Sequence, residues 1–217
     1  MLLEGARRDV VDTCRALRRE GLVVGTAGNV SVRDGDLIAV SPSGVDYDAL
    51  TPDLVAVHRL DDGEPVEAPV PASTELALHL LVVARTGAGA VVHTHAPAST
   101  ALGVVADELP ATHYYVALFG GPVRVAPYAT FGTPQLARSV AAALEGRTAA
   151  LMDRHGAVVT GTSARQALDR ARYLEYLCEV QLRALATGLP VRTLTPEQLA
   201  EAGEALARYG RPPSPTP

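Results

Sequence analysis

Two histidines, one residue apart, carry the strongest chemical signal in this sequence. His93 and His95 follow the apolar run Ala90-Val91-Val92, which predicts a buried strand that ends at the histidines. Side chains two positions apart on a strand point to the same side, so both imidazoles should face one point. Two neutral imidazoles on a rigid element form half of a catalytic zinc site, where zinc acts as a Lewis acid. Because six histidines in 217 residues can produce such a pair by chance, the hypothesis needs a third ligand.

A third histidine stands in a predicted tight connection between two strands. His155 lies between two short apolar segments that we expect to form a hairpin. The tip of a hairpin can converge with the end of a neighbouring strand, and catalytic zinc commonly takes three protein ligands while one position stays open. We therefore predict a zinc site made by His93, His95 and His155. We interpret His58 and His113 as ordinary half-buried histidines.

Glu75 allows two interpretations, both connected with that site. It opens a predicted helix and stands four residues before His79, so the two side chains could form a metal-binding pair on one helix face. Alternatively, Glu75 lies at the mouth of the site while His79 packs inside the protein. We favour the second interpretation, because a carboxylate is stabilised beside a helix N-terminus and can move there between metal and substrate. A glutamate that does both can act as a base.

Three short segments rich in small and hydroxyl residues occur at predicted turns or helix starts. Backbone N–H groups and hydroxyls in such places bind phosphate without a lysine. Each segment alone is ordinary turn chemistry, but three of them together with a metal site favour phosphate binding. The residues are Thr26, Gly28, Asn29, Ser43, Gly44, Ser73 and Thr74.

The composition is typical of a globular protein that acts on small molecules. Of the 217 residues, 47% are hydrophobic and 20% are charged, and the formal net charge is -5, so the basic surface of a nucleic-acid binder is missing. Cys14 and Cys178 are far apart and indicate no disulfide framework. The first residues contain no apolar signal segment, and the longest apolar stretch is too short to span a bilayer. We therefore expect a cytoplasmic protein without nucleic-acid or membrane partners.

The absence of lysine narrows the chemistry further. All 19 basic residues are arginine. Schiff-base chemistry requires a lysine amine, and a Walker A phosphate loop requires its own lysine, so both are excluded. If the protein handles carbonyl compounds, something other than an iminium must be the electron sink.

Hairpin signals mixed with helix signals predict an α/β protein with one mixed, mostly antiparallel sheet covered by helices. A loop of small residues, 25–32, runs into a strand, and the turn 33–36 separates that strand from a second one at 37–40, so we expect a hairpin there, and a further strand at 54–60. No linker divides the chain, so residues 1–210 should form one domain, and the Pro-rich end, 211–217, should be a disordered tail. Helices are expected at about 6–20, 75–84, 134–146, 163–187 and from 195 onward, and Thr133, Ser163 and Thr195 should cap the last three.

Six short motifs follow one another along the chain: GTAGNVSVR at 25–33, SPSG at 41–44, STE at 73–75, VVHTH at 91–95, APYATFGT at 126–133 and HG at 155–156. In this order and spacing they resemble the class II aldolase/adducin family, from the first helix to Tyr209. Each motif is short, but the combination is specific. Ser43 and Thr74 replace a threonine and a serine of the aldolase pattern, and both keep a hydroxyl.

The resemblance implies a three-layer α/β/α subunit that assembles as a cyclic homotetramer, with each active site at a subunit interface. One zinc ion per subunit would be held by His93, His95 and His155. Glu75 would ligate the zinc at rest and become the acid/base when substrate displaces it.

The resemblance also implies roles for two tyrosines and a phosphosugar substrate. Tyr114 would come from the neighbouring subunit and protonate an aldehyde oxygen, and Tyr209, in a mobile C-terminal segment, would help to close the site. The phosphate would lie among the hydroxyl-rich segments. The implied reaction is the reversible cleavage of a ketose 1-phosphate to dihydroxyacetone phosphate and a small aldehyde such as L-lactaldehyde, with zinc in place of the missing lysine.

Three alternatives lie within or beside this family. Pentulose-phosphate 4-epimerases tend to carry an aspartate at the place of Glu75, so the glutamate favours an aldolase. Methylthioribulose-1-phosphate dehydratases keep a glutamate and stay open as an alternative. A non-catalytic, adducin-like interaction module has no need of Glu75 together with His93, His95 and His155, and all four are present.

Overall fold

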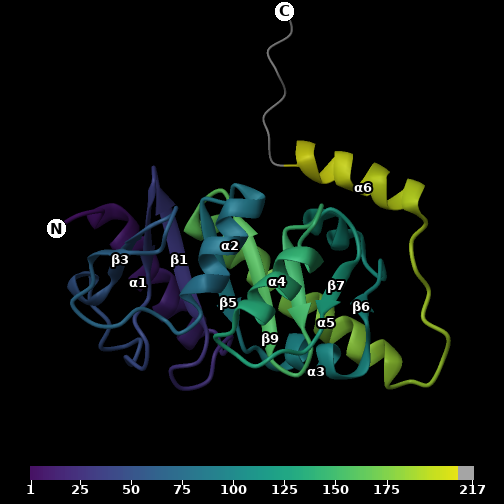
Figure 1. The fold of residues 1–217 in the computed structure, drawn as a ribbon. Coiled ribbons are helices and arrows are strands. Elements are labelled where there is room, and N and C mark those ends of the chain that lie inside the picture. The colour runs from purple at the N-terminus through teal and green to yellow at the C-terminus, as the bar shows by residue number, and fades with distance from the viewer. Residues whose placement is uncertain (210–217) are drawn as a thin grey trace, which may run out of the picture.

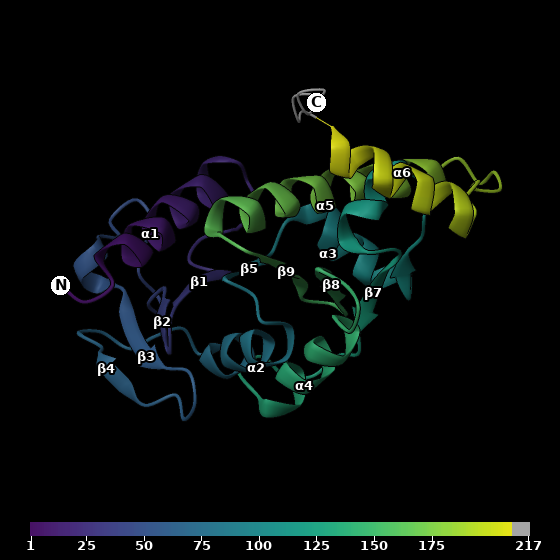
Figure 2. The ribbon, with the colours of Figure 1, turned by 90° about the horizontal axis from the view of Figure 1, so that it is seen from above.

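A computed structural model describes residues 1–209, in which nine strands form one sheet with helices on both faces (Figures 1 and 2). The strand order is β4-β3-β2-β1-β5-β9-β8-β7-β6. Within these residues every neighbouring pair of strands is antiparallel except β7 and β8, which run parallel. The predicted α/β architecture with a mixed, mostly antiparallel sheet is confirmed. The predicted Pro-rich tail, 211–217, lies outside the described residues.

The elements have the following bounds. The strands are β1 Asn29–Asp34, β2 Leu37–Val40, β3 Ala56–Arg59, β4 Pro65–Glu67, β5 Ala90–Thr94, β6 Glu108–Leu109, β7 Val123–Ala126, β8 Ala149–Met152 and β9 Gly156–Gly161. The α-helices are α1 Glu4–Arg19, α2 Leu76–Thr86, α3 Pro97–Val105, α4 Pro134–Ala143, α5 Ala164–Leu185 and α6 Pro196–Arg208, and two 3-10 helices are η1 Pro52–Leu54 and η2 Tyr114–Phe119. None of the helices within residues 1–209 combines the length and the apolar character needed to cross a membrane.

The apolar side chains of the strands divide the core between the two faces of the sheet. On β5, Val92 belongs to the cluster formed with α1, α3 and α5, whereas Val91 belongs to the cluster formed with α2 and α4. Val159 and Val158 on β9 divide in the same way. Figure 2 shows α1 and α5 along one side of the sheet and α2 and α4 along the other. The three layers follow from the two-residue alternation of side chains along a strand.

Three helices begin at the predicted capping residues. The side-chain oxygens of Thr133, Ser163 and Thr195 each accept a hydrogen bond from a backbone N–H in the first turn of α4, α5 and α6. Thr195 also forms a capping box, because the side chain of Gln198 accepts from the Thr195 backbone N–H.

Two predicted bounds are wrong by a few residues. The strand expected at 54–60 begins only at Ala56, because Leu54 ends η1, which starts with a proline whose φ suits a helical turn. The helix expected to continue to Gly146 ends at Ala143, and Gly146 follows in a left-handed turn with φ 67°.

The antiparallel pairing of β5 with β9 places the histidines of the predicted site. Thr94 is the partner of Ala157 in this ladder, so the end of β5 lies beside the start of β9. β8 and β9 form a hairpin closed by Asp153-Arg154-His155, since Met152 pairs with Gly156. The hairpin tip that carries His155 therefore stands next to the end of β5.

Gly156 allows these two strands to approach closely at that point. A Cβ atom on Gly156 would lie 2.1 Å from the carbonyl oxygen of Thr94 and 3.4 Å from the Cα of His95. No side chain fits there unless the backbone shifts. Gly156 thus couples the position of His155 to the position of the β5 end.

We predict that Gly156→Ala destabilises the protein by roughly 1–3 kcal/mol, because the added methyl group forces β9 away from β5. Urea unfolding followed by circular dichroism measures the change. The matched control is Gly5→Ala in α1, where an added Cβ meets nothing within 4 Å. This control should be as stable as the wild type or up to about 1 kcal/mol more stable, since alanine is the better helix former. Equal stability of Gly156→Ala and wild type would contradict the close approach.

Candidate metal centre

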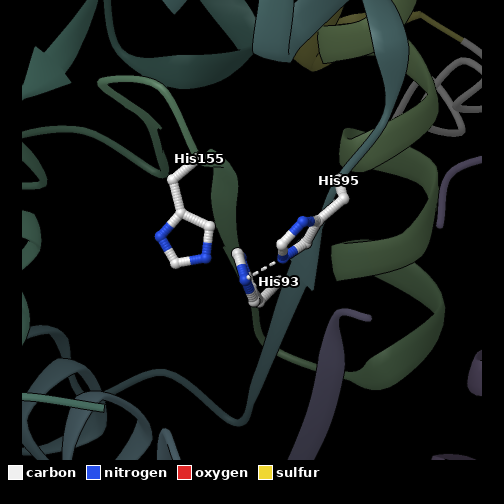
Figure 3. A group of neighbouring side chains, drawn as sticks. All are labelled: His93, His95 and His155. Carbon is white, nitrogen blue, oxygen red and sulfur yellow. Dashed lines mark hydrogen bonds between the residues drawn. The ribbon is translucent and has the colours of Figure 1, made fainter. Parts of the chain in front are cut away.

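The three histidines predicted as metal ligands converge in the structure. One ligand nitrogen of each lies within 4.8 Å of those of the other two. The ring centroids are between 4.7 and 4.9 Å apart. Figure 3 shows the rings facing a common centre, with His93 and His95 at the end of β5 and His155 in the turn before β9. Within the part of the chain that the structure describes, this group could hold a metal ion.

Hydrogen bonding orients His93, and burial keeps the other two imidazoles neutral. The Nδ1–H of His93 donates to the carbonyl oxygen of Ala157 at 2.9 Å, so its Nε2 is the ring nitrogen that faces the other two histidines. This Nε2 lies 2.9 Å from the Nε2 of His95. Burial lowers the pKa of His95 to about 4, and it also lowers the pKa of His155. Both rings are therefore neutral at neutral pH, as metal ligation requires.

Glu75 is the N-cap residue of α2, and its carboxylate lies beside two of these histidines, His93 and His155. Its Oε2 lies 3.1 Å from the Nε2 of His93 and accepts a hydrogen bond from the Nδ2 of Asn29 at 2.9 Å. Its Oε1 is buried, has no hydrogen-bond partner within residues 1–209, and lies 3.8 Å from the Nε2 of His155. Burial raises the pKa of Glu75, but the hydrogen bonds and charge of its neighbours, His93 above all, outweigh burial and hold it well below the usual range. The carboxyl group is therefore ionised.

These residues fit a divalent metal ion. Three neutral imidazoles and one carboxylate are the nitrogen and oxygen donors found in catalytic zinc sites. The buried Oε1 of Glu75 lacks the partner that a cation would provide. Cys14 and Cys178 are buried in the other core cluster, where burial raises the pKa of both thiols, so they take no part in this centre.

A cavity of about 340 Å³ opens beside the histidines. Glu75, His95 and His155 line one part of it, and His93 is fully buried. All seven residues predicted to bind phosphate also line the cavity, so the structure brings the three hydroxyl-rich segments to one place. These residues are Thr26, Gly28, Asn29, Ser43, Gly44, Ser73 and Thr74.

Backbone contacts hold the hydroxyl-rich segments against one another and against β5. An isolated bridge between Pro42 and Ala72 joins the second segment to the third. Gly28 in the first segment has a φ of 78°, and a Cβ there would lie 2.8 Å from the carbonyl oxygen of His93. Only glycine combines this backbone conformation with this close approach.

Three large side chains that were not predicted as site residues also line the cavity: Tyr128, Phe131 and Arg154. The two aromatic rings are 56% and 66% exposed, so they form part of the rim. The guanidinium group of Arg154 lies over the Tyr128 ring, 4.9 Å from its centroid, and pairs with Asp153 at 2.8 Å. The signal that could have located them is their place in the APYATFGT motif and directly before His155.

Tyr114 and Tyr209 do not line the cavity of their own chain. They line a second cavity of about 630 Å³ together with residues of η2, α5 and α6. Tyr114 is 44% exposed and Tyr209 is 87% exposed. A role for Tyr114 at a metal centre would therefore require a neighbouring copy of the chain. That role stays a prediction.

The remaining histidines are bonded to other groups. His79 is fully buried, and its two ring nitrogens are within hydrogen-bond distance of Ser31 and Asn29, so it is packed in the interior and does not join the metal centre. His58 and His113 each bond to a nearby backbone group.

The chain is similar to known proteins over nearly its whole length. The family described as Class II Aldolase and Adducin N-terminal domain matches residues 8–182. An L-fuculose phosphate aldolase of Escherichia coli strain K12 is 39% identical over 205 residues, which are 94% of each chain. A 5-methylthioribulose-1-phosphate/5-deoxyribulose-1-phosphate aldolase of Rhodospirillum rubrum is 39% identical over 206 residues, which are 94% of this chain and 92% of that protein. A solved structure of an L-fuculose 1-phosphate aldolase has a TM-score of 0.90 and 31% identity, covering 95% of this chain and 98% of its own.

We predict that the three histidines bind one Zn²⁺ per chain. Isothermal titration of metal-free protein with Zn²⁺ should show this stoichiometry. His155→Ala removes a ligand and should weaken the Zn²⁺ affinity by more than roughly 100-fold. Losing a residue that only hydrogen-bonds to a ligand typically weakens it roughly 10- to 100-fold. The matched control, His58→Ala, removes a buried histidine outside the group and should bind Zn²⁺ like the wild type. Unchanged affinity in His155→Ala would contradict the site.

Proposed function

The chain belongs to the class II aldolase and adducin family and is an aldehyde-lyase, and on this premise we propose that it cleaves a ketose 1-phosphate into dihydroxyacetone phosphate and a small aldehyde. The observation that carries the proposal is the composition of one cavity. It joins two of the three grouped histidines, His95 and His155, and an ionised glutamate to three hydroxyl-rich segments suited to phosphate, and the third histidine, His93, is buried behind them. A ketose 1-phosphate presents both chemical features, a pair of oxygens for the metal and a phosphate close to them.

The proposed cofactor is one zinc ion held by His93, His95, His155 and Glu75. Bound there, it would supply Lewis acidity for the negative charge that develops on substrate oxygens as the C–C bond breaks. This is the task that an iminium performs in lysine-dependent aldolases, and the chain contains no lysine.

Glu75 is the proposed acid/base. Its carboxyl group is ionised, its Oε1 has no partner within the described residues, and the residue lines the cavity. In the direction of addition it would remove a proton from a carbon of dihydroxyacetone phosphate, and on cleavage it would return that proton. Its place at the N-terminus of α2 stabilises the charged form that this role requires.

Tyr114 and Tyr209 are proposed to act in a homotetramer. Tyr114 of a neighbouring copy would serve the aldehyde oxygen, and Tyr209 would help to close the site. The support is that both tyrosines are exposed and lie outside the cavity of their own chain, while the aldehyde end of the substrate still needs a proton donor. We propose that the enzyme works in the cytoplasm, in keeping with its two unpaired cysteines.

The proposed sugar is L-fuculose 1-phosphate, which would yield L-lactaldehyde. The support is the L-fuculose phosphate aldolase relative at 39% identity. A second candidate is a 5-deoxyribulose or 5-methylthioribulose 1-phosphate, because the relative named for these sugars has the same identity. The test must also distinguish aldolase activity from the epimerase and dehydratase activities considered as alternatives.

A coupled assay for dihydroxyacetone phosphate over a panel of ketose 1-phosphates and pentulose 5-phosphates tests the proposal. We expect cleavage of one or more 1-phosphates, loss of activity with a chelator and recovery on addition of Zn²⁺. Full activity after metal removal would refute the proposal. Epimerisation of a 5-phosphate without C–C cleavage, or the loss of water alone from a 1-phosphate, would also refute it. So would the absence of turnover of any sugar, which is the result expected of an interaction module.

Glu75→Gln separates the two proposed roles of the carboxylate. We expect Zn²⁺ to remain bound, because the three histidines persist, while kcat falls on the order of 10²- to 10⁴-fold with loss of the acid/base. Steady-state kinetics and metal analysis of the same preparation measure both. The control, Glu64→Gln on the exposed turn before β4, should keep full activity. Complete loss of metal in Glu75→Gln would instead make this residue mainly structural.

A further inference from the structure

Four buried polar side chains form a line from the interior of the protein to the metal centre. Asn29 and Ser31 lie two residues apart on β1, so both project from the face of the sheet that α2 covers. Glu75 and His79 lie one turn apart at the start of α2. None of the four is more than 5% exposed. The line therefore runs through the interface between β1 and α2 and reaches the cavity only at Asn29 and Glu75.

Consecutive members of this line are within hydrogen-bond distance. The Oγ of Ser31 lies 2.6 Å from the Nδ1 of His79, and the Nε2 of His79 lies 2.5 Å from the Oδ1 of Asn29. The Nδ2 of Asn29 lies 2.9 Å from the Oε2 of Glu75. Both ring nitrogens of His79 and both polar atoms of the Asn29 amide thus have a partner within the line.

The orientation of the Asn29 amide determines the direction of the bonds in the line. Its NH₂ group donates to the Oε2 of Glu75, which turns its carbonyl oxygen to His79. That oxygen can only accept, so the Nε2 of His79 must carry the hydrogen. The Nδ1 of His79 then faces the hydroxyl of Ser31, which can donate to it. Turning the Asn29 amide over would place its oxygen 2.9 Å from the carboxylate, with no hydrogen between two acceptors.

The orientation of the Asn29 amide decides which carboxylate oxygen of Glu75 is free. Oε2 lies between the Nδ2 of Asn29 and the Nε2 of His93. Oε1 has no partner within the described residues and is the oxygen nearer to His155. A carboxylate that lost its bond to Asn29 could rotate and exchange the two oxygens.

We propose that His79 is a positioning residue that acts through Asn29 and holds the Glu75 carboxylate with Oε1 turned towards metal and substrate. This inference rests on the proposed function, because it gives His79 a purpose only if Glu75 works as metal ligand and acid/base. His79 touches neither substrate nor metal and is not a catalytic residue.

The surroundings of His79 favour this role over simple packing. The other buried side chains of α2 are Leu78, Val82 and Val83, so the interior face of the helix is otherwise apolar. An imidazole in such a place is unfavourable unless both of its nitrogens are bonded, and an apolar side chain would pack there without that requirement. A merely structural histidine would affect stability alone, whereas a positioning histidine also affects turnover.

The first experiment needs no variant. Long-range ¹H–¹⁵N NMR of metal-free wild-type protein, labelled with ¹⁵N in its histidines, reports the tautomer of each ring. We expect the hydrogen of His79 on Nε2 and a bare Nδ1. A His79 ring that carries its hydrogen on Nδ1 would overturn the proposal, whatever the activity of the enzyme.

The second experiment compares two variants that each keep half of the bonding. The amide nitrogen of glutamine reaches about as far as the Nε2 of histidine, so His79→Gln can still donate to Asn29. The amide nitrogen of asparagine reaches only about as far as Nδ1, so His79→Asn loses that bond. We expect kcat of His79→Asn to fall roughly 10- to 100-fold with KM nearly unchanged, and His79→Gln to stay within a few-fold of wild type.

Zn²⁺ and Co²⁺ binding to the metal-free variants gives a readout independent of turnover. His79→Asn should bind Zn²⁺ more weakly, and the visible spectrum of its Co²⁺ form should differ from that of the wild type, because Glu75 is no longer held. His79→Gln should match the wild type in both. The control His58→Asn changes another buried histidine, away from the cavity, and should alter stability without altering kcat or the Co²⁺ spectrum.

The outcomes separate this inference from the proposed function. A wild type that binds no metal or cleaves no ketose 1-phosphate refutes the proposed function. A wild type that does both, together with His79→Asn at full kcat and unchanged metal affinity, refutes only the positioning role. Equal losses in His79→Asn and His79→Gln also refute it, since the bond to Asn29 would then not matter.

Discussion

The pairing of β5 with β9 is the constraint on which the rest of the site depends. In this ladder His93 faces Val158 and Thr94 faces Ala157, at the centre of the nine-stranded sheet. A slip of one residue would turn every side chain of β5 to the opposite face, and His93 would point to α1 and α5. The same pairing supplies the carbonyl of Ala157 that accepts from the Nδ1–H of His93 and so turns its Nε2 towards the other histidines. One backbone register therefore sets the position, the face and the ring orientation of a proposed metal ligand.

The second organising feature is a buried negative charge. Glu75 is ionised although it is only 5% exposed, and such a charge must be compensated by hydrogen bonds, a counter-charge or a metal. His93, Asn29 and the start of α2 provide part of that compensation and leave one oxygen free. In the proposed function, this free oxygen would bind the cation and move the proton. The polar line that ends at His79 extends this electrostatic arrangement into the core.

Much of the fold and of the candidate site could be predicted because the signals are local. The apolar run before His93 predicted a central strand, and Thr133, Ser163 and Thr195 marked helix starts by their capping chemistry. The bounds near Leu54 and Gly146 were wrong because short helical turns compete there with the longer elements. The Tyr128 and Arg154 rim was missed because the path of a loop, and not its composition, decides which side chains border a cavity. For His79, a spacing of four residues from Glu75 fits a metal pair and a packed interior equally well, so periodicity could not choose between them.

The sequence by itself determined the chemical classes that are open to this protein. The absence of lysine excludes an iminium, the triplet His93-Thr94-His95 on a strand offers two aligned imidazoles, and the hydroxyl-rich motifs offer a phosphate site. Only the tertiary structure decided that His155 meets the first two histidines, that Glu75 keeps one oxygen free, and that the Asn29 amide has one allowed orientation. These facts depend on strand register and on contacts between residues far apart along the chain, such as His93 with Ala157, which are 64 positions apart. Residue types and local spacing set what a side chain can do, and long-range packing sets which groups it meets.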